Sequence, residues 1–567
     1  MAKLKPPGVG GKDGAKRASV SGKLSTSSVA MLAGALGCVA YLGWFVTLGS
    51  SVPGVAAGVA ARETPRGMSA EEALANRELV RDMFYHSYDN YMAHAFPRDE
   101  LRPIACKGHD THNCHGCMLT FYDALDTLAV LENRTEFRRV VDWLALNGAA
   151  TFNREVTVSV FETNIRVLGS LISNHLLAED PDLKLYPGYK GELLTLAVDV
   201  GTRLLRAYNT PTGLPFGSVD LSLGPRFGET PVSATARGGT VLLEFILLSK
   251  LSGDKKFARA AERATKALWE RRSSIGLLGS HVNVETGEWV YFDSGIGGGI
   301  DSFFEYLMKA HLLTGKALYL DMFEEGYAAI NTHTKHNGWY VDVDMRSGQV
   351  MFPYYRSLQS FWPGLQVLYG DLPAAEELFD RFFGIWRQYG FVPEAYNVGT
   401  GQPQPGMGQY PLRPELAESA FYLYRATGDA KYRIAGAEMI ASLNTHARVQ
   451  CGYAAIENVT TKELRDHMDS YFIAETVKYL YLLFDDSAWT TPFRDPSKYI
   501  FNTEAHLLPL PKPPASEFLL SRSNPPDPSH RIARAAKRGG RTAEEQAARR
   551  KRKRDKKKLA KGGDAEL

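Results

Sequence analysis

Two kinds of helical segment alternate through the middle of the chain, between about residues 76 and 510. A strongly apolar run ends at a small Gly-containing turn, and a more polar amphipathic run follows it, as in SAFYLYRATGDAKYRIAGAEMIASL. Glycine commonly ends a helix because it adopts the left-handed conformation without strain. The turns at Gly253, Gly315, Gly370 and Gly428 recur about every 60 residues. This spacing predicts a series of helical hairpins.

Looser copies of the same unit bring the apolar helices to seven: FYDALDTLAVLEN, FETNIRVLGSLISNHLLAED and, last, YFIAETVKYLYLLFDD. A helix that is apolar on all sides is buried, whereas an amphipathic helix keeps one face in water. Each apolar helix is followed by a more polar one, or in the last case by a closing segment. The pattern therefore predicts an all-α fold with two concentric layers, an α/α barrel whose inner layer is apolar.

Acidic residues recur near the beginning of the apolar helices. They are Asp123, Asp126, Glu162, Asp301, Glu415, Glu418 and Glu475. Parallel inner helices place their equivalent ends at one mouth, so we expect these carboxylates to line a common cavity. Any one of them is also explained by helix capping or by the helix dipole. Seven together indicate a site, because buried carboxylates are costly unless they bind cations, share protons or do chemistry.

An uncharged segment precedes the repeats and runs from Leu24 to Ala61. Its apolar part, Val29 to Leu48, matches the ~20 residues of a bilayer-spanning helix, and the basic flank before it keeps the N-terminus cytosolic. A cleaved signal peptide and a buried soluble helix are the alternatives. We predict a basic cytosolic N-terminus at 1–23, a transmembrane signal anchor of type II topology at 24–50, a linker at 51–77 and a lumenal barrel at 78–510.

The segment 511–567 follows the barrel and is a Pro-rich spacer that leads into a basic tail, RRKRKRDKKKLAK. Such a charge run is expected to stay disordered. Residues 531–567 contain fifteen Lys/Arg and five Asp/Glu, and residues 1–23 contain six Lys/Arg and one Asp. The net charge of the whole chain is only +3, so the part between these two segments is acidic. Its charge therefore does not predict nucleic-acid binding. On the type II topology the tail shares the lumen with the barrel.

The chain resembles glycoside hydrolase family 47, the class I α1,2-mannosidases. The resemblance lies in several of these segments and in ELRPIACKGHDTH, TPTGLPFGSV, FWPGLQVLYGD, YPLRPELAESAFYLYRATGD and IFNTEAHLLP. Within that family the chain is most similar to the EDEM group, the endoplasmic reticulum degradation-enhancing α-mannosidase-like proteins. The resemblance covers about residues 78–509 in the family's order. It implies an (α/α)7 barrel with a calcium ion at its base, in agreement with the seven apolar helices.

The resemblance also implies four catalytic acids: Glu162 in FETNIR, Asp301 in GIDSFFEY, Glu394 in VPEAYN and Glu415 in LRPE. An inverting glycosidase uses one carboxylic acid to protonate the leaving oxygen and a carboxylate across the ring to activate water. The resemblance suggests Glu162 as the acid and Glu415 as the base, with Asp301 another candidate in the relay. Glu394 is a second donor candidate, and its Pro-flanked loop makes a structural role an equal alternative.

Thr503 in FNTEAH matches the residue that holds calcium in the family. A hard cation with one direct protein residue must fill the rest of its ~6–8 ligand positions with water and sugar hydroxyls. Glu418, Glu475 and Glu504 would orient those waters. Arg166 and Arg413, each close in sequence to a catalytic acid, would hold carboxylates ionised or grip hydroxyls, with structural ion pairs as the alternative.

The cysteines divide into a predicted bridge and an open question. Cys106 and Cys451 lie in segments that resemble the EDEM pattern, and a disulfide between them would join the first and sixth repeats. The stretch HDTHNCHGC departs from the related sequences. Cys114, Cys117, His112 and His115 are too crowded for an ideal tetrahedral zinc site. A redox C-x-x-C, a structural disulfide and free thiols stay open, and a lumenal thiol oxidoreductase partner is a hypothesis.

The sequence therefore predicts a calcium-dependent, inverting α1,2-mannosidase of the endoplasmic reticulum membrane. It would trim high-mannose N-glycans on misfolded glycoproteins and so mark them for degradation. Sequons at Asn133 and Asn458 fit a lumenal glycoprotein. Two alternatives remain: a mannose-binding quality-control lectin without turnover, and a general ER or Golgi glycan-processing mannosidase.

Overall fold

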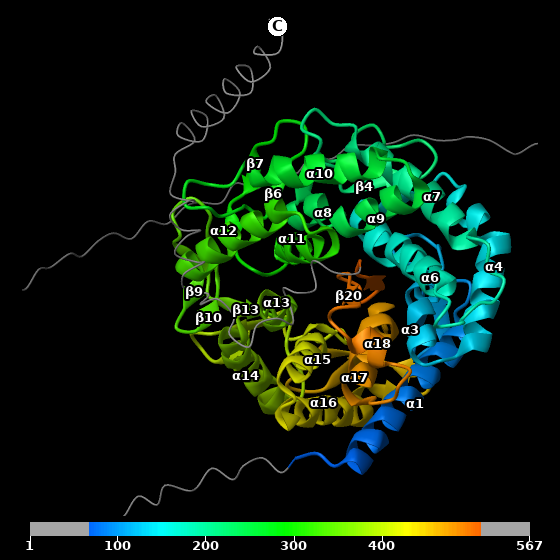
Figure 1. Ribbon diagram of the computed structural model, residues 1–567. Coiled ribbons are helices and arrows are strands. Elements are labelled where there is room, and N and C mark those ends of the chain that lie inside the picture. Colours follow the sequence, from blue (N-terminus) through cyan, green and yellow to red (C-terminus); the bar gives the residue numbers. More distant parts are fainter. Residues whose placement is uncertain (1–66, 512–567) are drawn as a thin grey trace, which may run out of the picture. The chain divides into compact units, whose positions relative to one another are not determined.

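The computed structural model describes residues 67–511, which form a ring of helices in two layers (Figure 1). The inner helices are α3 (Leu125–Val130), α6 (Gly169–Glu179), α9 (Leu242–Ser252), α11 (Asp301–Thr314), α13 (Trp362–Tyr369), α15 (Glu415–Thr427) and α17 (Val477–Phe484). The outer helices are α4 (Arg134–Phe152), α7 (Glu192–Leu204), α10 (Lys256–Trp269), α12 (Ala317–His333), α14 (Leu372–Tyr389), α16 (Ala430–Ser442) and α1 (Ala70–His94). The described part of the chain thus contains the seven helix pairs of the predicted barrel.

The seventh pair is assembled from opposite ends of the described chain. Helix α17 packs against α1, the first helix of the described chain, which is its partner in the outer layer. A closing segment does follow α17 in the sequence, but the sequence pattern did not identify α1 as the outer partner of this helix. Helix α1 begins at Ala70 with a capping box between Ser69 and Glu72, so it starts within the residues 51–77 that we expected to be a linker.

The connections at the two ends of the barrel differ in length. Each of α9, α11, α13 and α15 ends at a glycine in the left-handed conformation, at Gly253, Gly315, Gly370 and Gly428, as the sequence pattern predicted. The next outer helix follows within a few residues. The return connections, from outer helix to next inner helix, are longer and contain most of the strands. The loops that can build a site therefore gather where the inner helices begin.

Short helices occupy several of these connections and helix ends. They are α2 (Leu119–Asp123), α5 (Val160–Glu162), η1 (Thr163–Leu168), η2 (Leu205–Tyr208), α8 (Thr235–Gly239), η3 (Ser357–Phe361), η4 (Leu443–Ala447), η5 (Phe472–Thr476) and α18 (Thr491–Arg494). Two of them, η1 and η5, are π-helical turns that lead directly into inner helices α6 and α17. Such turns often mark functional sites.

The strands are the feature that an all-α expectation lacked. Within residues 67–511 they form nine antiparallel sheets of two or three strands, and their length of two to four residues is too short for an alternating pattern to appear in the sequence. The paired strands are β1 (Glu100–Arg102) with β2 (Lys107–His109), β3 (Thr157–Ser159) with β4 (Ser218–Asp220), β9 (Lys335–His336) with β10 (Trp339–Tyr340), β16 (Arg448–Val449) with β17 (Gly452–Tyr453), β18 (Ala455–Asn458) with β19 (Glu463–Arg465) and β20 (Tyr499–Phe501) with β21 (Leu507–Pro509). The three-stranded sheets contain, in the order of neighbouring strands, β5 (Val232–Ala234), β6 (His281–Asn283) and β7 (Trp289–Tyr291); β12 (Val350–Phe352), β11 (Asp342–Asp344) and β8 (Asp293–Ser294); and β13 (Tyr354–Arg356), β14 (Ala395–Asn397) and β15 (Gln402–Pro403).

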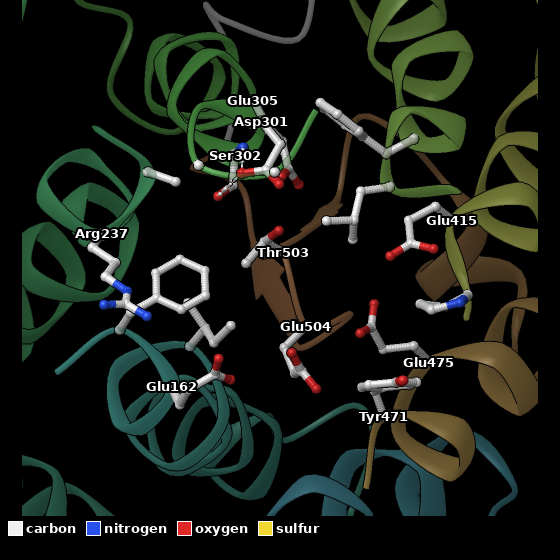
Figure 2. A pocket seen from close by; sticks show the side chains of 18 of the residues that line it. Glu162, Arg237, Asp301, Ser302, Glu305, Glu415, Tyr471, Glu475, Thr503 and Glu504 are labelled. Carbon is white, nitrogen blue, oxygen red and sulfur yellow. Dashed lines mark hydrogen bonds between the residues drawn. The ribbon is translucent and has the colours of Figure 1, made fainter. Parts of the chain in front are cut away.

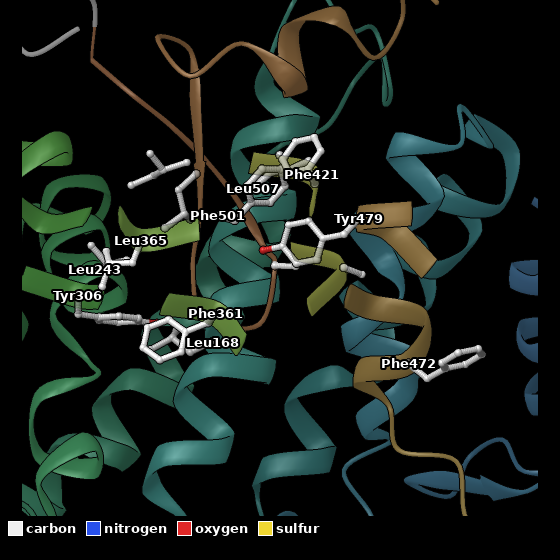
Figure 3. Close-up of a cluster of buried hydrophobic side chains, with 14 of the residues drawn as sticks. Leu168, Leu243, Tyr306, Phe361, Leu365, Phe421, Phe472, Tyr479, Phe501 and Leu507 are labelled. Atoms are coloured by element: carbon white, nitrogen blue, oxygen red, sulfur yellow. The ribbon is translucent and has the colours of Figure 1, made fainter. Parts of the chain in front are cut away.

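The last hairpin, β20–β21, lies inside the ring and contributes to the core (Figure 1). Phe501 packs edge-on against Phe421 of α15 at 5.8 Å and beside Tyr479 of α17 at 5.4 Å, measured between ring centroids. Leu507 is fully buried in the same cluster (Figure 3). The hairpin thus fills the inner space with apolar side chains on its strands, while its turn, residues 502–506, is left for a site.

The membrane anchor at 24–50 and the basic tail of 511–567 fall on residues 1–66 and 512–567, outside the described residues. Within residues 67–511 no helix combines the length and apolar character needed to cross a bilayer.

Candidate active site

One cavity of about 440 Å³ brings the predicted residues together at the end of the barrel where the inner helices begin. Its wall includes Glu162, Asp301, Glu415, Glu418, Glu475, Thr503 and Glu504, with Arg166 and Arg413. Figure 2 shows Thr503 and Glu504 in the middle of this group, with Glu162, Asp301 and Glu415 approaching from three different helices. The volume lies within the ~300–1,000 Å³ usual for small-ligand pockets.

The local structure explains why these acids point into the cavity. Asp301 and Glu415 are the first residues of α11 and α15, where the positive end of the helix dipole favours a carboxylate. Glu162 ends the short helix α5, whose cap Ser159 accepts a hydrogen bond from the Glu162 backbone N–H. The π-helical turn η1 then begins, and Glu475 lies within η5. Two of the wall's acids thus adjoin irregular turns of inner helices.

Arg166 connects the wall of the cavity to its floor. Its Nε donates to Glu162 Oε2 at 2.8 Å, one helical turn away, and its Nη1 donates to Glu504 Oε1 at 2.5 Å. The same Nη1 reaches Ser470 Oγ at 3.0 Å and lies 3.5 Å from Asp123 Oδ2. One buried guanidinium therefore fixes the orientation of Glu162 and compensates three carboxylates.

Glu394 lies behind the cavity wall and is not among the lining residues. Both of its carboxylate oxygens accept from Arg413, at 2.8 Å from Nε and 3.0 Å from Nη2, and Ser357 Oγ donates to it at 2.9 Å. Such a two-point contact fixes the guanidinium plane. This geometry favours the structural interpretation of Glu394, as the residue that positions Arg413.

Burial gives two of the wall's acids unusual proton affinity. It raises the pKa of Asp301 to about 7. Burial also raises the pKa of Glu415 to about 7, although the nearby Arg413 opposes the shift. Glu415 Oε2 has no hydrogen-bond partner in the structure. A carboxyl group with a pKa near neutrality can exchange protons during a reaction at that pH.

The floor of the cavity is a buried acidic cluster around the turn of hairpin β20–β21. Burial raises the pKa of Glu418 to about 8, and burial together with repulsion among neighbouring acids raises the pKa values of Glu475 and Glu504 well above their usual range. Glu504 is paired with Arg166, whereas the neighbouring lysines Lys309 and Lys478 are paired with Glu305 and Asp126. A cluster that contains more carboxylates than positive charges fits a hard cation such as Ca²⁺.

The spacing of these oxygens decides how a cation would be held. Among residues 67–511, the groups of three His, Cys, Asp or Glu side chains close enough to share one ion do not include the floor acids. Direct ligation by three carboxylates is therefore not supported. Thr503 as the direct ligand, with Glu418, Glu475 and Glu504 acting through water, agrees with this arrangement.

Asn502 holds the turn that carries Thr503. Its Oδ1 accepts from the backbone N–H groups of Glu504 and His506, both at 2.9 Å, and its Nδ2 donates at 2.9 Å to Ile165 O and to Glu244 Oε1. These bonds fix the conformation of the turn and tie it to η1 and to inner helix α9. Thr503 is thus placed by its neighbour in the sequence.

Asp123 and Asp126 do not line the cavity, which corrects the expectation that all seven acids meet at the mouth. Lys478 Nζ donates to Asp126 at 2.8 Å and the Leu507 backbone N–H donates to it at 3.1 Å. Burial alone would raise the pKa of Asp126, yet Lys478 and His506 lower it to about 2. Both aspartates lie behind the hairpin, so they support the site and do not face the cavity.

Several lining residues had no signal in the sequence, among them Tyr471, Arg237, His281 and Glu305. Tyr471 lies between the two arginines: the guanidinium of Arg166 is 5.4 Å from its ring centroid and that of Arg413 is 5.8 Å away. Its hydroxyl donates to Pro411 O at 2.7 Å. Tyr471 therefore sets the spacing between the Glu162 side and the Glu415 side of the cavity.

The structure contains the predicted disulfide between Cys106 and Cys451. It also pairs Cys114 with Cys117, and both side chains are buried. Of the interpretations left open for the C-x-x-C, this arrangement agrees with the structural disulfide. A mixed disulfide with a partner would require that buried bond to open.

Comparison with known proteins places this cavity in a family. The sequence profile of Glycosyl hydrolase family 47 matches residues 83–510. Alpha-mannosidase I MNS4 from Arabidopsis thaliana is 49% identical over 443 residues, which cover 78% of this chain and 70% of the relative. The ER degradation-enhancing alpha-mannosidase-like protein 2 from Homo sapiens is 46% identical over 455 residues, covering 77% and 78%.

The fold agrees with a solved enzyme of related sequence. The alpha-1,2-mannosidase from Trichoderma reesei superposes with a TM-score of 0.71 at 26% identity, covering 77% of this chain and 99% of that one. The profile match spans most of the barrel and the relatives exceed 30% identity over more than two thirds of the chain. The chain therefore belongs to glycosyl hydrolase family 47 and is a glycoside hydrolase.

Proposed function

We propose that the protein is an α1,2-mannosidase that trims high-mannose N-glycans of misfolded glycoproteins in the endoplasmic reticulum. The observation that carries the proposal is the single cavity in which Glu162, Asp301, Glu415 and Thr503 meet. The relatives named above as mannosidases and as ER degradation-enhancing proteins support the substrate and the compartment. On this proposal the segment 24–50 anchors the chain in the ER membrane with the barrel in the lumen.

The reaction proposed for these residues inverts the configuration of the sugar. Glu162 would supply the proton to the leaving oxygen, and Arg166 would fix the orientation of its carboxyl group at the cavity wall. Glu415 would take the proton from the attacking water on the opposite side of the cavity. Asp301, with its pKa near neutrality, is the candidate to pass a proton between bulk water and the reacting groups.

The chain's own residues would orient the sugar through the floor of the cavity. Thr503 would bind Ca²⁺ directly, and Glu418, Glu475 and Glu504 would hold its water ligands. When bound, the ion supplies open positions for sugar hydroxyls and positive charge beside the carboxylates. Arg413, fixed by Glu394, keeps a second positive charge beside Glu415, which favours the ionised form that a base needs.

Glycan profiling tests this proposal on the purified full-length protein. High-mannose N-glycan is incubated with the protein in calcium, in excess chelator, and with the variant Glu162→Gln. We expect removal of mannose that chelator abolishes and that Glu162→Gln slows by about 10²–10⁴-fold, the usual contribution of a general acid. Proton NMR of the first product should show the β-anomer of mannose.

A matched control separates loss of chemistry from loss of fold. Glu179→Gln changes a carboxylate at the other end of the same helical run, where the side chain is 54% exposed, and we expect it to leave turnover unchanged. Binding of the glycan without any turnover by the wild type would instead establish the lectin. Equal turnover on folded and denatured glycoproteins would favour a general processing mannosidase.

A further inference from the structure

A second group of possible metal ligands lies outside the cavity, beside the strands β1 and β2. Glu100 and His109 are directly opposite each other in this hairpin, and His467 approaches from the loop between β19 and η5. Glu100 Oε2 is 3.6 Å from His109 Nε2 and 3.7 Å from His467 Nε2. The three ligand atoms all lie within 4.8 Å of one another, although 358 residues separate the two histidines in the sequence.

The carboxylate of Glu100 is buried and only partly satisfied. Its side chain is 3% exposed. One oxygen, Oε1, accepts from the Ser470 backbone N–H at 3.1 Å, and the other, Oε2, has no hydrogen-bond partner. Burial, together with repulsion from Asp469, raises the pKa of Glu100 to about 8. An oxygen that faces two imidazoles at distances too long for hydrogen bonds is better explained by a shared ion than by direct contacts.

The distances suit a small tetrahedral ion. Zinc binds imidazole nitrogen and carboxylate oxygen at ~2.0–2.2 Å, so two ligand atoms of a tetrahedral site lie about 3.4 Å apart. The two carboxylate–imidazole separations exceed this by only a few tenths of an ångström. Two imidazoles with one carboxylate are also the donor set of zinc sites that keep one position for water. Calcium, by contrast, takes oxygen ligands.

We propose that Glu100, His109 and His467 form a binding site for a borderline divalent metal ion, with Zn²⁺ the ion that fits best. His467 Nε2 also lies 3.1 Å from Asp469 Oδ1. Metal binding would therefore replace the proton that this histidine shares with Asp469. The disulfide-bonded Cys114 and Cys117 are not needed for this site.

The site is connected to the catalytic cavity through one residue. Ser470 donates its backbone N–H to Glu100 and its Oγ accepts from Arg166 Nη1, and Arg166 holds Glu162. An ion on Glu100 would thus stabilise the segment 467–470, which leads into the lining residue Tyr471. Its role would be to position that segment, because none of its three ligands lines the cavity.

Metal binding to the full-length protein tests the proposal directly. The protein is stripped with chelator, saturated with calcium to occupy the acidic floor, and titrated with Zn²⁺. We expect one Zn²⁺ per chain. His109→Asn and His467→Asn should each weaken binding by more than the ~10–100-fold that loss of an outer-shell partner costs. Co²⁺ in place of Zn²⁺ should give the visible absorption of a tetrahedral site, absent in both variants.

Two further variants keep the result decisive. Glu100→Gln preserves the size of the side chain, so it tests the carboxylate even if a histidine variant folds poorly; it too should weaken Zn²⁺ binding. His112→Asn removes a nearby histidine whose ring contacts His115 instead and should bind Zn²⁺ like the wild type. Absence of binding by the wild type, equal binding by all variants, or binding lost only in His112→Asn would overturn the proposal.

Discussion

The residues of the cavity combine buried acids with two arginines that are already paired. Arg166 contacts Glu162 in the cavity wall, Arg413 contacts Glu394 behind the wall, and both guanidinium groups lie near the ring of Tyr471. Asp301 and Glu415 have no comparable partner, and burial raises their pKa values to about 7. These two acids therefore lower the stability of the folded state whenever they are ionised without a cation beside them.

This cost predicts how stability depends on pH and calcium. Glu415 has an ordinary pKa of 4.5 and a folded-state pKa of about 7, so between these values the folded state binds more protons than the unfolded state. Without calcium, the contribution of protonated Glu415 to the free energy of unfolding is fully present below about pH 4.5. It is lost as the pH rises to about 7. The difference of about 2.5 pKa units corresponds to about 3 kcal/mol.

Chemical denaturation at pH 4.5 and pH 7.5 measures this effect. In chelator, the wild type should lose more stability between the two pH values than Glu415→Gln, which cannot ionise. On the proposed function, calcium would bind the folded state and favour the ionised acids, so its stabilising effect should be larger at pH 7.5. The same pH dependence in wild type and variant would show that Glu415 is not the group responsible.

Sequence reasoning identified the acids of the wall and the arginines Arg166 and Arg413, and it missed other residues that line the cavity with them. Glu162, Asp301 and Glu415 stand out because carboxylates recur near the start of successive apolar helices and because their motifs resemble those of the family. Tyr471, Arg237 and His281 belong to connections or to a short helix and strand, where no periodicity distinguishes a lining residue from an exposed one. Asp126 shows the opposite error: it has the same helical position as the cavity acids, but its role depends on Lys478 and His506, which come from 352 and 380 residues away.

At the scale of elements, hairpin β20–β21 determines where the floor of the site lies. Its turn is packed tightly against inner helix α6, which begins at Gly169. A Cβ atom on Gly169 would lie 2.5 Å from Asn502 Nδ2 and 3.0 Å from His506 Cδ2. Asn502 holds the turn by four hydrogen bonds. No side chain larger than hydrogen fits at position 169 without moving that turn.

Gly169→Ala should therefore impair the site more than the fold. We expect the turn to move and Thr503 with it, which should weaken calcium binding at least tenfold, the consequence expected when a supporting residue of a metal site is lost. Gly384→Ala is the matched control: Gly384 lies within outer helix α14, where a Cβ atom would meet nothing within 4 Å. That variant should keep its calcium affinity and gain about 0.5–1 kcal/mol of stability.

Isothermal titration of calcium into the two variants compares them directly. Equal calcium affinity in Gly169→Ala and Gly384→Ala would show that the contact between α6 and the hairpin does not place the floor.

At the scale of the whole molecule, the ring is closed by elements from the two ends of the described chain. Six helix pairs are consecutive in sequence, whereas the seventh joins α1 to α17. The sequence pattern could predict the six consecutive pairs, because the two helices of each pair follow one another in the sequence, four of them across a glycine turn. It could not identify α1 as the seventh partner, since no local connection links it to α17 and its composition resembles that of other polar helices.

The disulfide between Cys106 and Cys451 secures this closure and carries the last prediction. It spans 345 residues, from the β1–β2 turn after α1 to the β16–β17 turn before α17. In the chain-entropy description, a bridge closing so long a loop restricts the unfolded chain by about 6 kcal/mol, whereas the Cys114–Cys117 bridge, with a separation of 3 residues, contributes about 2 kcal/mol. The double variant Cys106→Ala/Cys451→Ala should therefore be about 4 kcal/mol less stable than Cys114→Ala/Cys117→Ala in denaturant titrations. Equal losses in the two double variants would mean that the α1–α17 contact closes the ring without help from the long-range bridge.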